Sequence, residues 1–351
     1  MVNKRILIIR LGAVGDVIRT LPVLKEIKKK YFDYQIDWIV EEASANILKD
    51  NPYLNEIIIL PRKKIVSLFK EHKYKELYQL IKEIKKKLKE KKYFIVYDFH
   101  GILKSGILSF LTGAPIRIGF SPFYSKELNF LFNKKWISPQ SKYITRIERN
   151  FALIEKELNI DELEWNIVIP EEDKIYINNF LKETNLEEKK IIGINPAVSS
   201  FGRYKEWFVE YYAKLIDLIS NDNKEFEFVL TWGPGEEEKV NKIKELTKKR
   251  VIIAPKTTLK QLAYLISKFS YFISGDTGPM HLAEAMGTKV IAIFGPSDVR
   301  INRPIKKTNI AIFTDVGCNP CRNRKCKLLK CQYELTPDFV YEELKKRDYL
   351  K

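Results

Sequence analysis

Short apolar segments alternate with helical patterns along most of the 351-residue chain. Near the start, apolar runs at 5–11, 35–41 and 56–60 are separated by helical patterns at 17–31 and 42–50. Apolar strands separated by helices at this spacing form parallel βαβ units with right-handed crossovers. The sequence therefore predicts an α/β protein built on parallel sheets.

The same alternation resumes in the second half of the chain. Further strands are expected at 191–198, 226–233, 251–255, 271–276 and 290–295. We expect an N-terminal Rossmann-like domain at 1–170, a second one at 185–335, and a final helix at 336–351 that packs back toward the first domain. Two doubly wound domains facing each other across a cleft would bring their strand C-termini together, where such sheets bind ligands.

The chain is strongly basic, with 62 Lys and Arg against 45 Asp and Glu and a net charge of +17. Nucleic acid, an anionic membrane or a phosphorylated substrate would suit this charge. No helix-turn-helix, RNP-type or zinc-finger pattern accompanies it, which disfavours nucleic acid. No apolar run reaches the roughly 18 residues of a membrane span, and no cleavable leader pattern is present, so we expect a cytoplasmic protein.

The segment SGDTGPMHLAEAMG carries more polar chemistry than a strand-to-helix turn requires. Asp276, Thr277 and Gly278 precede a helix with a proline in its first turn, and His281 follows. Free N–H groups at a helix start favour an anion, and glycine allows its close approach. The alternative is an ordinary helix cap with a core histidine.

The first turn, RLGAVGDVIRTLP, places Asp16 at the entrance of a helix after two glycines. It is neither a GxGxxG fingerprint nor a Walker A motif, which disfavours a Rossmann dehydrogenase. A carboxylate there would repel a phosphate but could act as a general base. The alternative is again a capping aspartate at the positive end of the helix dipole.

Two further loops follow strands of the second half. The segment NPAVSSFGRYKEW offers Ser199 and Lys205, and such a cation can neutralise a diphosphate; a solvated loop is the alternative. The segment TWGPGEEEKV carries glutamates 236–238, which would bind ribose hydroxyls or simply complement a helix dipole.

Taken in order, the motifs GDVIRTLP, DWIVEE, DFHGILKSG, KEW, WGPGEEE, SGDTGPMHLAEAMG and FGPSD resemble the ADP-heptose:lipopolysaccharide heptosyltransferase family, inverting glycosyltransferases of the GT-B fold. The likeness covers residues 5 to about 335. It implies a glycosyltransferase that moves heptose from ADP-heptose to the Kdo/heptose inner core of lipopolysaccharide. Another envelope glycosyltransferase using a different nucleotide sugar is the alternative, and a basic nucleic-acid-binding protein a weaker one.

The resemblance also implies roles for matching positions. Asp16 would be the general base, and no cofactor would be required for catalysis. Donor binding would fall to Ser199, Lys205, Glu237, Asp276, Thr277, Gly278 and His281, and acceptor binding to Asp98, His100 and Lys104. Arg62, Lys63 and Lys64 follow the end of an expected strand, and we expect them to contact a phosphate of the acceptor.

All four cysteines lie within one C-x2-C-x4-C-x4-C segment, as Cys318, Cys321, Cys326 and Cys331. In a cytosolic protein such clustering favours a structural metal or cluster over disulfides. The spacing is not a standard zinc-ribbon pattern, and neighbouring basic residues would stabilise thiolates without a metal.

The lysine-rich helical segment 61–92 is either a solvated face or a membrane-docking one. Basic residues near an anionic bilayer contribute about 1 kcal/mol each. A lipid-linked acceptor would place the enzyme peripherally on the anionic inner membrane.

Overall fold

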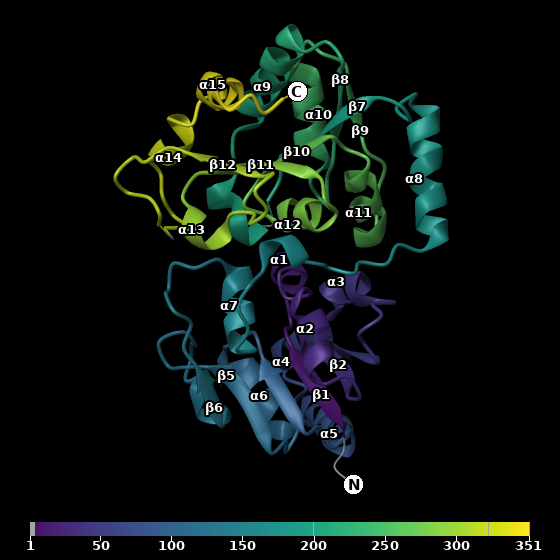
Figure 1. The fold of residues 1–351 in the computed structure, drawn as a ribbon, viewed down its shortest axis with the longest axis vertical. Helices are drawn as coiled ribbons and strands as arrows, with labels where there is room; N and C mark the ends of the chain where they lie inside the picture. The colour runs from purple at the N-terminus through teal and green to yellow at the C-terminus, as the bar shows by residue number, and fades with distance from the viewer. Residues whose placement is uncertain (1–3, 199, 322, 351) are drawn as a thin grey trace. The chain divides into compact units, whose positions relative to one another are not determined.

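The computed structural model describes residues 4–198, 200–321 and 323–350, and its chain divides into two compact units, Met1–Val168 and Ile169–Lys351 (Figure 1). Each unit contains one six-stranded sheet whose strand pairs are all parallel. The predicted α/β class with two doubly wound units is confirmed. Within the described residues, no helix combines the length and apolar character that crossing a bilayer would require.

The sheet of the first unit has the order β3-β2-β1-β4-β5-β6. Its strands are β1 Arg5–Ile9, β2 Gln35–Glu41, β3 Glu56–Leu60, β4 Ile95–Asp98, β5 Ile116–Phe120 and β6 Lys135–Ile137. The helices are α1 Val14–Ile18, α2 Val23–Lys30, α3 Glu42–Ala45, α4 Arg62–Lys70, α5 Tyr74–Glu90, α6 Leu103–Leu111 and α7 Arg146–Leu153, with 3₁₀ turns η1 Asn46–Leu48, η2 Asn129–Phe132 and η3 Ile160–Glu162.

Helices α4, α5 and α6 cover one face of this sheet. Ile65, Ile84, Leu88 and Leu108 pack with strand side chains such as Leu7 in one buried cluster. The amphipathic pattern expected for 61–92 therefore forms two helices, whose apolar sides are used by the core.

The sheet of the second unit has the order β12-β11-β10-β7-β8-β9. Its strands are β7 Lys190–Asn195, β8 Phe226–Leu230, β9 Val251–Ile253, β10 Tyr271–Gly275, β11 Lys289–Phe294 and β12 Ile310–Phe313. The helices are α8 Glu171–Glu183, α9 Val209–Asp222, α10 Glu237–Leu246, α11 Leu259–Ser267, α12 Gly278–Ala285, α13 Val299–Asn302, α14 Lys330–Tyr333 and α15 Pro337–Lys346, with a 3₁₀ segment η4 at Ser200–Lys205.

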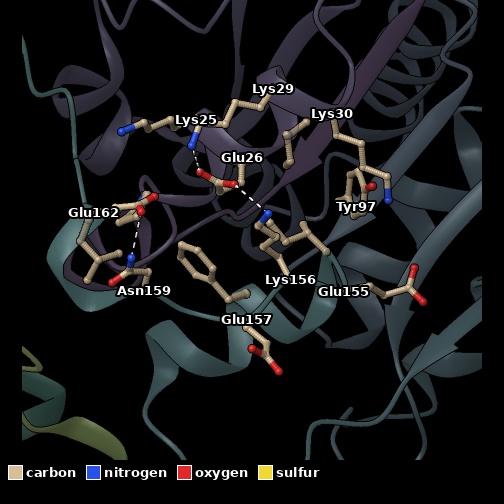
Figure 2. A pocket seen from close by; sticks show the side chains of 15 residues that line it. Lys25, Glu26, Lys29, Lys30, Tyr97, Glu155, Lys156, Glu157, Asn159 and Glu162 are labelled. Atoms are coloured by element: carbon tan, nitrogen blue, oxygen red, sulfur yellow. Dashed lines mark hydrogen bonds and ion pairs between the residues drawn. The ribbon is translucent and has the colours of Figure 1, made fainter.

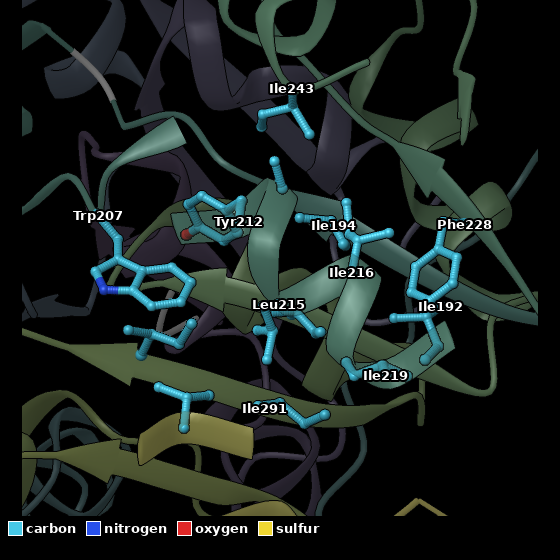
Figure 3. Packing of buried hydrophobic residues seen from close by; sticks show 14 of the residues in the cluster. Ile192, Ile194, Trp207, Tyr212, Leu215, Ile216, Ile219, Phe228, Ile243 and Ile291 are labelled. Atoms are coloured by element: carbon cyan, nitrogen blue, oxygen red, sulfur yellow. The ribbon is translucent and has the colours of Figure 1, made fainter. Parts of the chain in front are cut away.

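The core of this unit is centred on α9. Figure 3 shows Tyr212, Leu215 and Ile216 of that helix packed over strand side chains, including Ile194 and Phe228. These side chains are almost fully buried, as a parallel sheet covered by helices requires.

Two helices, α8 and α15, lie just outside the limits expected for the second domain. The charged segment after Pro170 is helix α8, which packs against α11 through a short apolar face containing Ile177 and Leu181. The final helix, α15, packs against α9 and adds Val340 and Leu344 to the core of the second unit. The apolar side of α15 is therefore used within its own unit, and packing of the segment 336–351 toward the first domain stays a prediction.

Candidate functional site

A cavity of about 180 Å³ lies at the C-terminal ends of β1 and β4 in the first unit. The titratable and polar side chains around it are those of Arg10, Asp16, His100, Tyr124, Lys126, Arg146, Arg149 and Asn150. Strand C-termini in doubly wound sheets form the edge at which ligands bind. The cavity brings together two predicted residues, Asp16 and His100, with a set of cations that the sequence analysis did not single out.

Asp16 is the third residue of α1, the short helix that follows β1. One carboxylate oxygen, Oδ1, accepts a hydrogen bond from Arg19 at 2.5 Å, and the other pairs with Arg10. Burial opposes ionisation of Asp16, but attraction to Arg10, Arg19 and Arg146 outweighs it and holds the pKa far below its usual range. Asp16 is therefore a fixed carboxylate with low proton affinity.

His100 lies beside this carboxylate as a neutral ring. The backbone N–H of Leu11 donates to its Nδ1 at 3.2 Å, so the ring proton is on Nε2. Burial and the nearby Arg10 lower the pKa of His100 to about 3. At neutral pH His100 can donate one hydrogen bond into the cavity but carries no charge.

Two of the arginines around the cavity, Arg146 and Arg149, come from α7. Thr145 and Glu148 form a capping box at its start, with the Glu148 N–H donating to Thr145 Oγ1 at 3.3 Å. Arg146 and Arg149 are three residues apart and share one side of this helix. Asn150 ties the helix to α1 by donating to the carbonyl oxygen of Arg19 at 3.0 Å.

The cations outnumber the carboxylates. Arg149 lies 4.1 Å from the centre of the Phe120 ring and donates to the carbonyl oxygen of Tyr124. Burial, with repulsion from Arg146 and Arg10, lowers the pKa of Arg149 to about 9. Like charges gathered around one cavity favour a bound anion.

Asp98 does not face this cavity as a ligand group. It is fully buried, and its Oδ1 accepts from the backbone N–H groups of His100 and Gly101 at 3.0 and 3.1 Å. Its Oδ2 accepts from Ser105 and Asn129 at 2.9 and 2.7 Å. Both oxygens therefore hold the β4–α6 turn in place, and the acceptor-binding role expected for Asp98 stays a prediction.

Two other predicted acceptor residues meet at Glu41, the last residue of β2. Arg62 donates to its Oε2 at 3.0 Å, and Lys104 pairs with its Oε1. Lys63 and Lys64 are exposed in the first turn of α4. The structure thus joins Arg62 and Lys104 through a carboxylate and leaves the other two at the surface.

In the second unit, the turn that we predict to bind an anion lies at the start of α12. Asp276 Oδ2 lies 2.6 Å from Lys205 Nζ, and this attraction, acting against burial, lowers the pKa of Asp276. The hydroxyl groups of Ser274 and Thr277 are 2.9 Å apart. Within the described residues the Thr277 side chain caps no N–H group of α12, so the first-turn N–H groups from Gly278 onward are available to an anion.

The structure also gives the positions of two of the other predicted donor residues, His281 and Glu237. His281 is buried within α12, 3% exposed. Glu237 is the exposed first residue of α10, whereas Glu236 turns back to accept from the Gly233 N–H at 2.7 Å. Ser199 lies outside the described residues.

A larger cavity of about 370 Å³ lies between α2 and the segment after α7, and Figure 2 shows its charged rim. Glu26 pairs with Lys29 at 2.7 Å and with Lys156 at 3.6 Å. The acidic and basic side chains around this larger cavity balance each other in charge, and none of the predicted site residues lines it. The cavity of about 180 Å³, in contrast, has an excess of basic side chains and contains the predicted residues Asp16 and His100.

The family model for glycosyltransferase family 9 (heptosyltransferase) matches residues 81–332, more than half of the sequence. This chain belongs to glycosyltransferase family 9. It is 27% identical to lipooligosaccharide heptosyltransferase 2 of Campylobacter jejuni over 342 residues, 95% of this chain and 96% of that protein.

Solved structures agree on the GT-B-like fold of this family 9 chain. A family 9 glycosyltransferase from Veillonella parvula has a TM-score of 0.81 at 22% identity, over 99% of this chain and 97% of that one. E. coli heptosyltransferase WaaC with ADP has a TM-score of 0.75 at 23% identity, over 97% and 99%. Membership of family 9 makes this chain a glycosyltransferase, as the resemblance implies.

The cysteines of this family 9 enzyme are free thiols that range from exposed Cys318 to buried Cys331. Burial, with repulsion from the other three cysteines, raises the pKa of Cys331 to about 11. In the part of the chain that the structure describes, no three Cys, His, Asp or Glu side chains converge as metal ligands would. A structural metal stays a prediction.

Proposed function

We propose that the chain transfers a heptose from ADP-heptose to the inner core of lipopolysaccharide with inversion at the anomeric carbon. Family membership and the names of similar proteins support the sugar and the acceptor. The single observation that carries the chemistry is the ionised Asp16 carboxylate among cations at the strand ends of the first unit.

Asp16 serves as the general base in this proposal. The acceptor hydroxyl loses its proton to Asp16, its oxygen bonds to the anomeric carbon, and the bond from that carbon to the diphosphate breaks to release ADP. Two arginine partners make Asp16 a weak base, so the proton moves late, when the new C–O bond has already made the hydroxyl acidic.

An anionic group of the acceptor binds the arginines of the same cavity. Arg146 and Arg149 face it from one side of α7, and Arg10 from the end of β1. Within the described residues, Arg149 Nε is buried and has no hydrogen-bond acceptor. A bound carboxylate or phosphate would supply one, and charge-assisted pairs with arginine are among the stronger hydrogen bonds.

The second unit holds the donor. The N-terminal turn of α12 and Lys205 would neutralise the departing diphosphate, and a helix start can do so without a metal ion. Lys205 is paired with Asp276, so the diphosphate must share this lysine with the carboxylate. The contribution of Lys205 to the free energy of ADP binding is therefore its interaction with the diphosphate minus the part of its interaction with Asp276 that is lost.

The lipid-linked acceptor would bring the enzyme to the inner membrane as a peripheral protein with a cytoplasmic active site. The basic helices α4 and α5 support this placement, because their lysines would attract anionic headgroups. The proposal assigns no role to nucleic acid.

Calorimetry with ADP, UDP, GDP and CDP, each with Mg²⁺ and with a chelator, tests the donor. We expect ADP to bind most tightly and equally well in both conditions. Preference for another nucleotide would overturn the heptose donor, and a strict need for Mg²⁺ would contradict leaving-group stabilisation by α12 and Lys205.

A further inference from the structure

The outer surface of α4, α5 and α6 carries apolar side chains that face water. Among the described residues, 14 of the 23 exposed large hydrophobic side chains lie between residues 59 and 143. Six of them form two sets, Tyr74, Tyr78 and Ile81 on α5 and Leu103, Ile107 and Phe110 on α6. Each set repeats at i, i+4 and i+7, so each is a stripe along one side of its helix.

The two stripes lie on neighbouring helices. Helix α5 packs against both α4 and α6, and the three helices cover the same face of the sheet. The surface continues onto η2, because the Phe110 ring lies 6.1 Å from that of Phe132, and Leu131 beside it is exposed. Exposed apolar side chains gathered on neighbouring elements mark an interaction site.

The charge around these stripes selects the partner. Residues 62–92 contain thirteen Lys or Arg and four Glu, so this short segment holds +9 of the chain's net charge of +17. A second copy of the chain would bring the same positive charge against it, which disfavours self-association. An anionic bilayer offers headgroups for the lysines and acyl chains for the stripes, and Tyr side chains suit the boundary between them.

We propose that the stripes of α5 and α6, with the lysines of α4 and α5, form a docking face for an anionic lipid bilayer. The apolar side chains enter the headgroup and acyl boundary while the lysines bind anionic lipid. The inference deepens the proposed function and rests on it, because a lipid-linked acceptor is the reason to bind a membrane through the unit that contains Asp16.

Cosedimentation of the full chain with phosphatidylglycerol-containing and pure phosphatidylcholine vesicles tests the docking face. We expect binding to the anionic vesicles that weakens as salt rises. The Ile81→Glu/Ile107→Glu variant should lower the partition coefficient by roughly tenfold or more, since the stripes no longer enter the bilayer. The matched control is Ile175→Glu/Leu246→Glu, at exposed positions of α8 and α10, which should bind as the wild type does.

Three outcomes would overturn the docking face. In the first, the wild type does not bind anionic vesicles. In the second, Ile81→Glu/Ile107→Glu, the stripe variant, binds them as well as the control variant does. In the third, sedimentation velocity shows that the wild type and the control variant are dimers and that the stripe variant is a monomer. The last would make a second copy the occupant.

Transfer to a deacylated, water-soluble acceptor separates this inference from the proposed function. The stripe variant should retain wild-type transfer to that acceptor. A wild-type enzyme that transfers heptose to this acceptor but does not bind vesicles would refute the docking face alone. A wild-type enzyme that binds vesicles but transfers no heptose would refute the proposed function alone.

Discussion

Arg19 Nη2 lies 2.5 Å from Asp16 Oδ1, and Arg10 pairs with the second carboxylate oxygen. The two guanidinium groups fix the direction of the carboxylate and keep it ionised. The same pairing weakens it as a base. Catalysis by Asp16 therefore depends on orientation and on a late proton transfer more than on proton affinity.

Replacing Asp16 with Asn should remove the proton acceptor while keeping the shape of the side chain. We expect kcat to fall by about 10²- to 10⁴-fold, with the Kd for ADP near that of the wild type. Steady-state kinetics and calorimetry give the two values. Asp161→Asn, at an exposed position of η3, is the matched control. An Asp16→Asn enzyme with normal turnover would eliminate Asp16 as the base.

Arg149→Ala should raise the KM for the acceptor. The loss of a charge-assisted hydrogen bond costs about 1.5 to 3 kcal/mol, which corresponds to roughly 10- to 100-fold in affinity. The Kd for ADP should not change, because Arg149 belongs to the first unit and the proposed donor turn to the second. Arg117→Ala, which removes another arginine of the first unit that lies outside the cavity, serves as the control. An unchanged acceptor KM in Arg149→Ala would contradict the anion site.

Lys205→Ala should weaken ADP binding by two effects. It removes a cation and leaves Asp276, 9% exposed in its side chain, as an unpaired carboxylate near the diphosphate. Adding Asp276→Asn should therefore restore part of the lost affinity. Calorimetry on the two single variants and the double variant measures the coupling. Additive losses would show that Lys205 and Asp276 do not compete as proposed.

His281→Ala should also weaken ADP binding without a change in acceptor KM. His281 is the buried fourth residue of α12 and interacts electrostatically with Asp276, at the helix start where the phosphates are proposed to bind. Calorimetry again provides the readout, with thermal unfolding to separate binding from folding. Wild-type affinity in a folded His281→Ala variant would remove this residue from the donor site.

The neutral state of His100 predicts a pH dependence of stability. Its pKa falls from an ordinary value of about 6.5 to about 3 on folding, so between these values the unfolded chain binds a proton that the native one does not. Its contribution to stability is therefore present above pH 6.5 and is lost as pH falls, by about 2 kcal/mol between pH 7 and 5. Denaturant unfolding of His100→Gln should show a shallower loss over this interval.

The exposed His72 provides the control for that measurement. The control variant is therefore His72→Gln. A His100→Gln variant with the wild-type slope would show that His100 is not held neutral.

A structural metal at the four cysteines predicts about one bound zinc or iron per chain in protein purified without chelator. Elemental analysis measures the content, and thiol titration should find the cysteines protected until a chelator or mercurial is added. Protein free of metal with four freely titrating thiols would refute the metal.

The doubly wound fold could be predicted because strand and helix patterns alternate clearly, and the turn motifs identified Asp16 and Asp276 before any geometry was known. The limits of the second unit were harder to predict. Helix α8 buries only Ile177 and Leu181, so its charged surface conceals the core pattern.

The cationic cavity could not be predicted from the sequence. Arg146 and Arg149 share a cavity with Asp16 because α7 is hydrogen-bonded to the end of α1, more than a hundred residues away in the chain. In a chain with 62 basic residues, two more arginines carry no signal of their own. The capping box at Thr145 and Glu148 would have marked the helix start, but not the direction in which it faces.

The measurement that tests the central claim most directly is transfer itself. Purified enzyme is incubated with ADP-heptose and a deacylated inner-core acceptor, and the product is analysed by mass spectrometry and by NMR of the new anomeric centre. The account predicts one heptose added per acceptor with inverted configuration, and no product with Asp16→Asn. A product with retained configuration, or no transfer by a wild-type enzyme that binds ADP, would contradict it.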